Sequence, residues 1–110
     1  MSDLMQPFSM AGKTVLVADA STQLGAHFAR LISLAGARVA LGAQCPAQLE
    51  QLQADLRWDG GEVLIVSLDS ARRASIETAL DAVEERFGSV DVLINNSAER
   101  EHPARNNHLV

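Results

Sequence analysis

The residues best placed to do chemistry lie in one turn near the start of the chain. An apolar run over 14–18 leads into Asp19, Ser21, Gln23 and Gly25, where a helical pattern of apolar residues begins. The first N–H groups of a helix and its dipole favour an anion, and glycines let the backbone approach that anion closely. The segment is therefore typical of a turn that binds phosphate at the start of a helix.

The rest of the chain supplies the elements that would hold this turn in place. Apolar runs typical of strands lie at 14–18, 38–41, 63–66 and 90–94. Helical patterns lie between them at 24–35, 46–56 and 70–87, and Ser70 is expected to cap the third helix. Near-continuous apolar strands that alternate with helices predict an α/β fold, a doubly wound parallel sheet covered by helices.

Composition and charge exclude several classes of function. The chain has 110 residues and a formal net charge of -5, which argues against a surface built for nucleic acid. We expect one domain over 1–98 and a disordered tail over 99–110, because the tail has no apolar periodicity. No apolar run is long enough for a membrane span, and the single cysteine, Cys45, is typical of a reducing compartment. We therefore expect a cytoplasmic location and no membrane partner.

Several segments, taken together, resemble one known family. They are the run at 12–17, the turn at 18–25, the run at 34–41, the pair Leu68-Asp69, and the run at 90–96 that ends in Asn95-Asn96. In this order and spacing, over about residues 8 to 98, they resemble the short-chain dehydrogenase/reductase family. The resemblance implies a partial Rossmann-like sheet of four strands in the order 3-2-1-4, with three helices. It also implies an oxidoreductase that uses NAD or NADP.

The phosphate turn departs from the family pattern T-G-x-x-x-G-x-G. Ala18 stands for the threonine, Asp19 for the first glycine and Gln23 for the second, while Gly25 is kept. The first glycine makes the tight turn and the second makes room for the pyrophosphate. Asp19 adds a negative charge beside an anion site, and Gln23 adds bulk. We therefore predict weak binding of NAD or NADP.

The resemblance also names the residues that would contact the cofactor. They are Ser21, Gln23, Leu24, Gly25, Asp69 and Asn95. In the family the acid after the third strand caps the adenine pocket, but a helix-capping role for Asp69 is an equal alternative. After the second strand, where an acid would favour NAD and an arginine NADP, the sequence has Ala43, Gln44 and Cys45. These residues supply neither an acid nor an arginine, so the choice between NAD and NADP stays open at this point.

The catalytic residues of the family have no counterpart in this chain. The family uses a serine and a Tyr-x-x-x-Lys pair that lie further along the chain, the tyrosine acting as general acid or base. This sequence has no tyrosine, and Lys13, its one lysine, precedes the first strand. We predict no catalytic or metal-binding residues and an inactive chain, and the substrate cannot be deduced.

Two other classes of protein are considered beside a truncated oxidoreductase. A phosphoacceptor receiver domain would also place an acid such as Asp69 after its third strand, but it needs an acidic pair after the first strand and a late lysine. A noncatalytic fragment that pairs with itself or with a full-length dehydrogenase is the stronger alternative. Without the family's later strands, Val92, Leu93 and Ile94 would lie on an open sheet edge, which recruits other chains.

Overall fold

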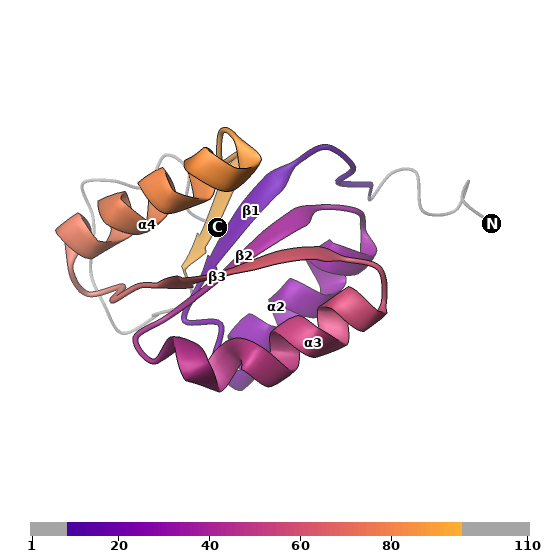
Figure 1. Cartoon of the computed structure of the whole chain (residues 1–110), viewed down its shortest axis with the longest axis horizontal. Helices are drawn as coiled ribbons and strands as arrows, with labels where there is room; N and C mark the ends of the chain where they lie inside the picture. The colour runs from indigo at the N-terminus through magenta and orange to yellow at the C-terminus, as the bar shows by residue number, and fades with distance from the viewer. Residues whose placement is uncertain (1–8, 96–110) are drawn as a thin grey trace.

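A computed structural model describes residues 9–95, which form a sheet between two layers of helices (Figure 1). The strands are β1 (Thr14–Ala18), β2 (Arg38–Ala43), β3 (Glu62–Ser67) and β4 (Val92–Asn95). The helices are α2 (Gln23–Leu34), α3 (Glu50–Trp58) and α4 (Arg73–Phe87), with a short 3-10 helix, η2 (Pro46–Leu49), directly before α3. The start of the chain and the expected tail at 99–110 lie outside the described residues.

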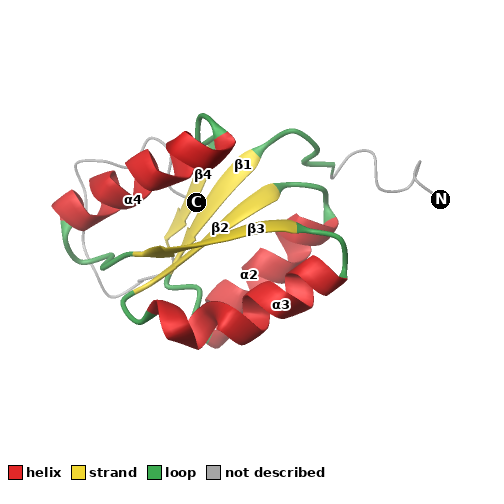
Figure 2. Ribbon diagram, in the orientation of Figure 1, coloured by secondary structure: helices red, strands yellow, loops and turns green. Residues whose placement is uncertain are grey.

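The sheet has the order β3-β2-β1-β4, and every neighbouring pair is parallel. In the register, Val17 of β1 lies between Leu41 of β2 and Ile94 of β4. The predicted α/β class, strand order and set of three helices are therefore confirmed. Because all four strands run the same way, the turns that follow β1, β2 and β3 gather at one end of the sheet (Figure 2).

Each face of the sheet has its own hydrophobic core. Helices α2 and α3 cover one face, and α4 covers the other (Figure 2). Alternate residues of β1 therefore enter different cores: Val15 and Val17 pack on the side of α2 and α3, and Leu16 packs on the side of α4. All five residues of β1 are buried. This two-sided burial explains why the strand is apolar throughout rather than alternating.

Several predicted boundaries differ from the structure, and two of these errors have a clear physical cause. Ser70 does not cap the third helix, because α4 begins at Arg73 and its N-cap is Arg72. The Ser70 hydroxyl instead donates a hydrogen bond to the Asp19 carboxylate. The fourth strand begins at Val92 rather than at Val90. Before it, the Asp91 carboxylate accepts a hydrogen bond of 2.9 Å from the Thr14 N–H, so this residue ties the loop to β1.

Two kinds of feature are absent from the part of the chain that the structure describes. None of its helices is both long and apolar enough to cross a membrane. Within residues 9–95 there is also no group of three or more His, Cys, Asp or Glu side chains that could hold a metal ion.

Candidate nucleotide crevice

The turn between β1 and α2 has the backbone of a glycine turn without its first glycine. Asp19 has a φ of 59°, in the left-handed region, which aspartate enters more readily than most other residues. Its carbonyl oxygen accepts hydrogen bonds from both the N–H and the hydroxyl of Thr22, at 3.1 Å and 2.9 Å. The tight turn is therefore retained although the residue has changed.

Gly25, the glycine that is kept, allows α2 to pack directly against this turn. A Cβ atom at this position would clash with the Asp19 carbonyl oxygen and would lie 3.0 Å from the Ala20 Cα. Both atoms belong to the backbone and cannot move aside as a flexible side chain would. The position therefore needs glycine for reasons of space.

Thr22, which the sequence analysis passed over, caps α2. Its hydroxyl oxygen accepts a hydrogen bond of 2.9 Å from the Gly25 N–H, as an N-cap side chain does. A threonine directly before the helical pattern was the signal that would have identified it. Gln23 and Leu24 follow as the first two residues of the helix, where backbone N–H groups have no earlier turn to bond to. Ser21, Gln23 and Leu24 are all exposed.

Asp69 lies in the turn after β3, on the far side of β2 from the phosphate turn. Its carboxylate accepts hydrogen bonds from the Ala71 N–H at 3.0 Å and from the Gln44 side chain at 3.4 Å. Its own N–H donates to the Ser75 hydroxyl at 2.8 Å. Asp69 therefore braces the turn before α4 and joins it to the residue after β2, whereas the N-cap position of α4 is occupied by Arg72.

The two turns meet above the end of β2. The Ser70 hydroxyl lies 3.1 Å and 3.0 Å from the two carboxylate oxygens of Asp19, and Ser70 is only 5% exposed. Both turns are also anchored on β2: the Ala20 N–H donates to the Gly42 carbonyl at 2.8 Å, and the Leu68 N–H donates to the Ala43 carbonyl at 2.9 Å. Sequence reasoning missed this contact because 51 residues separate Asp19 from Ser70.

Asn95 lies on the opposite side of the phosphate turn. It is the last residue of β4 and pairs in the register with Ala18 of β1. Strands β2 and β3 are added on one side of β1, and β4 is added on its other side, so the strand order reverses between β1 and β4. Open α/β sheets bind ligands in the crevice at such a switch point, outside the carboxyl ends of the strands.

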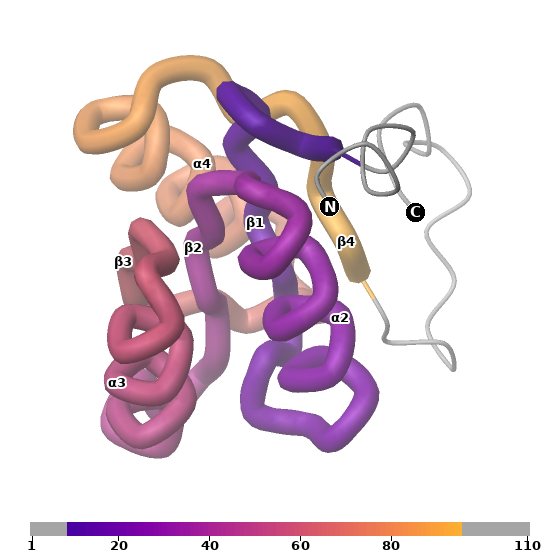
Figure 3. The backbone as a smooth tube through the Cα atoms, turned by 90° about the vertical axis from the view of Figure 1, so that its right-hand side faces the viewer, coloured from indigo at the N-terminus to yellow at the C-terminus, as the bar shows by residue number. Residues whose placement is uncertain are grey.

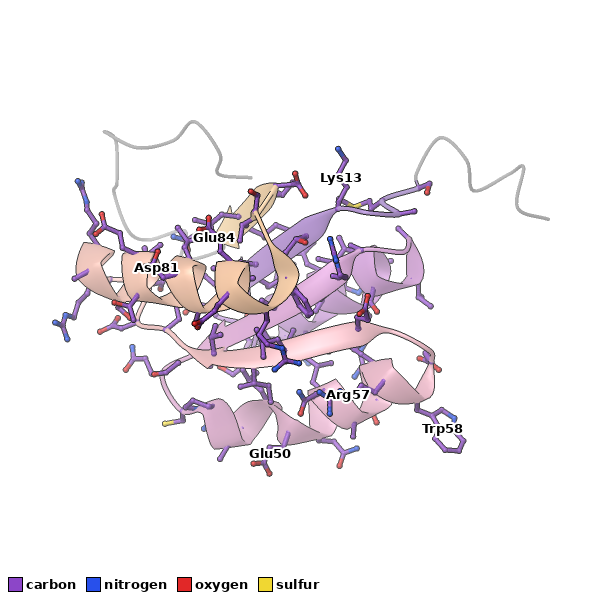
Figure 4. All side chains as sticks on the ribbon, turned by 45° about the horizontal axis from the view of Figure 1, so that its top comes forward. Lys13, Glu50, Arg57, Trp58, Asp81 and Glu84 are labelled. Carbon is purple, nitrogen blue, oxygen red and sulfur yellow. The ribbon has the colours of Figure 1, made fainter. Side chains whose placement is uncertain are left out.

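The structure thus gathers the six predicted contact residues around one end of the sheet. Ser21, Gln23, Leu24 and Gly25 lie together at the start of α2, with Asn95 on one side and Asp69 on the other. Lys13 comes directly before β1, at the opposite end of the strands, and points away from the sheet (Figure 4). It therefore lies far from any group bound in the crevice.

Comparison with known proteins gives the family. A family model described as short chain dehydrogenase matches residues 13–108. The chain belongs to this family. The match continues past residue 98, into the segment expected to be a tail. The resemblance predicted from the sequence is confirmed.

Individual relatives are similar over most of this chain but over a minor part of their own length. D-threitol dehydrogenase of Mycolicibacterium smegmatis is 36% identical over 90 residues, which cover 82% of this chain and 35% of that protein. A fatty acyl-CoA reductase of Mycobacterium tuberculosis is 31% identical over 93 residues, or 84% of this chain and 32% of that protein. The chain therefore spans about a third of the length of these two relatives.

Solved structures agree with the fold. A dehydrogenase/reductase from Sinorhizobium meliloti superimposes with a TM-score of 0.80 at 30% identity, over 87% of this chain and 38% of that chain. A variant of actinorhodin polyketide ketoreductase, solved with NADPH, superimposes with a TM-score of 0.71 at 34% identity, over 76% of this chain and 32% of that chain.

Proposed function

We propose that this chain is the dinucleotide-binding part of an NAD(P)-dependent oxidoreductase, and that the 110-residue chain alone binds the cofactor weakly and transfers no hydride. The observation that carries the proposal is the turn between β1 and α2. It keeps the left-handed backbone at Asp19 and the close contact at Gly25, both of which a dinucleotide turn requires.

Weak binding follows from the side chains that have replaced glycines in this turn. Gln23 is the first residue of α2, where the backbone must approach the pyrophosphate, and Asp19 brings a carboxylate into the same turn. Steric bulk and like charge both oppose a bound diphosphate. The family relation supports NAD or NADP as the ligand, and the relative solved with NADPH is an example of such binding.

Isothermal titration calorimetry with NAD, NADH, NADP and NADPH tests the binding proposal. We expect dissociation constants no tighter than about 1 mM, which corresponds to about -4.1 kcal/mol. A micromolar constant for any of the four would contradict weak binding. The control ligand is free ATP. It shares the adenosine and the phosphates with the four cofactors but has no nicotinamide, so it tests the adenosine and phosphate end of the crevice alone.

The absence of hydride transfer is proposed from the chemistry of the chain. The sequence has no tyrosine to exchange a proton with the substrate, and Lys13 lies at the opposite end of the sheet. An alcohol and ketone panel, followed by the absorbance of reduced nicotinamide, should show no turnover. Turnover that survives repurification and disappears in Asn95→Ala would contradict the proposal.

An interaction role is the second candidate function, and β4 favours it. Among the described strands, β4 pairs with β1 alone, so its other edge has no partner strand within residues 9–95 (Figure 3). We propose that this edge pairs with a second copy or with a full-length dehydrogenase. A cytoplasmic location is also proposed, on the single cysteine and the family, and cell fractionation would test it.

A further inference from the structure

The end of β2 lacks the acid that dinucleotide sites of this architecture use. In such sites an acidic residue after the second strand accepts hydrogen bonds from the hydroxyls of the adenosine ribose. Here the chain continues from β2 as Ala43, Gln44 and Cys45. An acceptor for the adenosine ribose must therefore come from another element.

Asp19, in the turn after β1, places a carboxylate near the end of β2. Asp19 is hydrogen-bonded to Ser70, which follows β3, and β2 lies between these two strands in the sheet. The Asp19 carboxylate therefore lies over the end of β2, where the ribose-binding acid is expected. Asp19 is half-buried rather than buried, so part of the residue is accessible to solvent.

The contacts of Asp19 fix the position of the carboxylate. Its backbone is held by two hydrogen bonds from Thr22, and its side chain is held by the hydroxyl of the buried Ser70. An ionised carboxylate has about four lone-pair positions, so it can accept from Ser70 and from a ribose hydroxyl at the same time. A 2′-phosphate at that place would instead bring two like charges together.

We propose that Asp19, positioned by Ser70, is the residue that selects the adenosine: it accepts a hydrogen bond from a free 2′-hydroxyl and excludes a 2′-phosphate. The proposal rests on the proposed nucleotide-binding function, and it deepens that function by favouring NAD over NADP. Asp69, the acid on the turn after β3, adds negative charge on the same side of β1. Arg72 and Arg73 are the basic residues nearest to it in the chain, and both are exposed at the start of α4.

Two small nucleotides test the selection without the weak pyrophosphate and nicotinamide contacts. AMP carries a free 2′-hydroxyl, and adenosine 2′,5′-bisphosphate carries the 2′-phosphate. Both are titrated to about 20 mM into the ¹⁵N-labelled chain, and the dissociation constants are taken from the NMR shifts of the amides. This range of concentrations reaches millimolar affinities. We expect AMP to bind at least about tenfold tighter than the bisphosphate, because repulsion between one close pair of like charges weakens binding by about that factor.

Three variants assign this discrimination to its residues. Asp19→Asn keeps the size of the side chain and removes its charge. The dissociation constants of the two nucleotides should then differ by no more than about threefold. Ser70→Ala releases the carboxylate and should reduce the ratio while AMP still binds. Asp81→Asn removes the same charge from the exposed surface in the middle of α4 and should keep the wild-type ratio (Figure 4). The amide spectrum of each variant shows whether it is folded.

The outcomes separate this proposal from the one on which it rests. Equal constants for the two nucleotides in the wild-type chain, or tighter binding of the bisphosphate through Arg72 and Arg73, would overturn the role of Asp19 and leave nucleotide binding intact. A ratio that Asp19→Asn does not change would overturn it as well. The absence of any AMP-dependent shift at the highest concentration would contradict the proposed nucleotide-binding function itself.

Discussion

At the scale of single residues, the phosphate turn shows which parts of a glycine motif the backbone needs. Gly25 is needed for space, because a Cβ would clash with the Asp19 carbonyl oxygen. The position of Asp19 needs a left-handed backbone, which aspartate can adopt at moderate cost. Gln23, in contrast, lies in regular helix and is exposed, so the fold tolerates it and any penalty falls on the ligand.

Gly25→Ala is therefore expected to destabilise the fold. The added methyl group meets backbone atoms of Asp19 and Ala20, so α2 must shift away from the turn, at a cost of about 1–3 kcal/mol. Urea denaturation followed by circular dichroism measures the loss. The matched control is Gln23→Ala in the same first turn of α2, where a surface change is worth within about 0.5 kcal/mol. Equal stabilities for the two variants would show that the close contact carries no energy.

Gln23→Gly should improve binding of the cofactor without a matching gain in stability. Removing the side chain gives the pyrophosphate access to the start of α2, and we expect NAD to bind about tenfold tighter, or about 1.4 kcal/mol. Gln23→Ala is again the control, since it keeps the Cβ that obstructs the approach. Calorimetry compares the three chains. If Gln23→Gly brings no gain, the side chain of Gln23 is not the cause of the weak binding.

At the scale of elements, the sequence predicted each strand and helix but placed some of their ends incorrectly. Continuous apolar runs and helical spacing were sufficient for the four strands and three helices, because burial on both faces of the sheet imposes those patterns. The start of α4 could not be predicted. A serine before a helical pattern usually caps the helix, and here Ser70 is recruited by Asp19 from a turn 51 residues away. Long-range contacts of this kind leave no local signal.

The candidate site shows the same division. The residues of the β1–α2 turn were identified because they are contiguous in the sequence and match a family pattern. The orientation of the Asp19 carboxylate, toward Ser70 and over the end of β2, depends on how two distant turns pack. Trp58, outside the site, also could not be placed from the sequence. A large aromatic residue usually packs against the core, yet this one, at the end of α3, is 90% exposed and points away from the molecule (Figure 4).

The N-cap of α2 gives a prediction at this scale. Thr22→Ala removes the acceptor of the Gly25 N–H and should lower the free energy of unfolding by about 1 kcal/mol. Thr78→Ala is the matched control, because Thr78 is an exposed residue inside α4 whose hydroxyl only donates back to the Ala74 carbonyl. Alanine is favoured there, so this control should be neutral or slightly stabilising. Losses of equal size in the two variants would contradict a specific capping role.

At the scale of the whole molecule, two surfaces of the described part of the chain are candidates for contact with another chain, the edge of β4 and the exposed leucines of α2. The outer edge of β4 has no partner strand within residues 9–95. On α2, the side chains of Leu24, Leu31 and Leu34 are 52%, 51% and 66% exposed. Scattered exposed leucines are ordinary on a surface, but an open strand edge also presents unpaired backbone groups that another chain can pair with. We therefore expect β4 to be the stronger attraction.

The last prediction is that the isolated chain self-associates through β4. In light scattering across a concentration series, the apparent mass should rise with concentration, and Leu93→Lys should hold it near the monomer value, because a charge on an edge strand opposes pairing. Leu34→Lys adds the same charge to the exposed surface of α2 and should leave the association unchanged if the strand edge is the contact.

Leu93 is half-buried and packs at the margin of the core beneath α4, so a thermal melt must first show that Leu93→Lys is folded. A wild-type chain that stays monomeric at every concentration, with a sharp cooperative melt, would mean that the edge of β4 is already covered. An association lost in Leu34→Lys and kept in Leu93→Lys would instead locate the contact on α2.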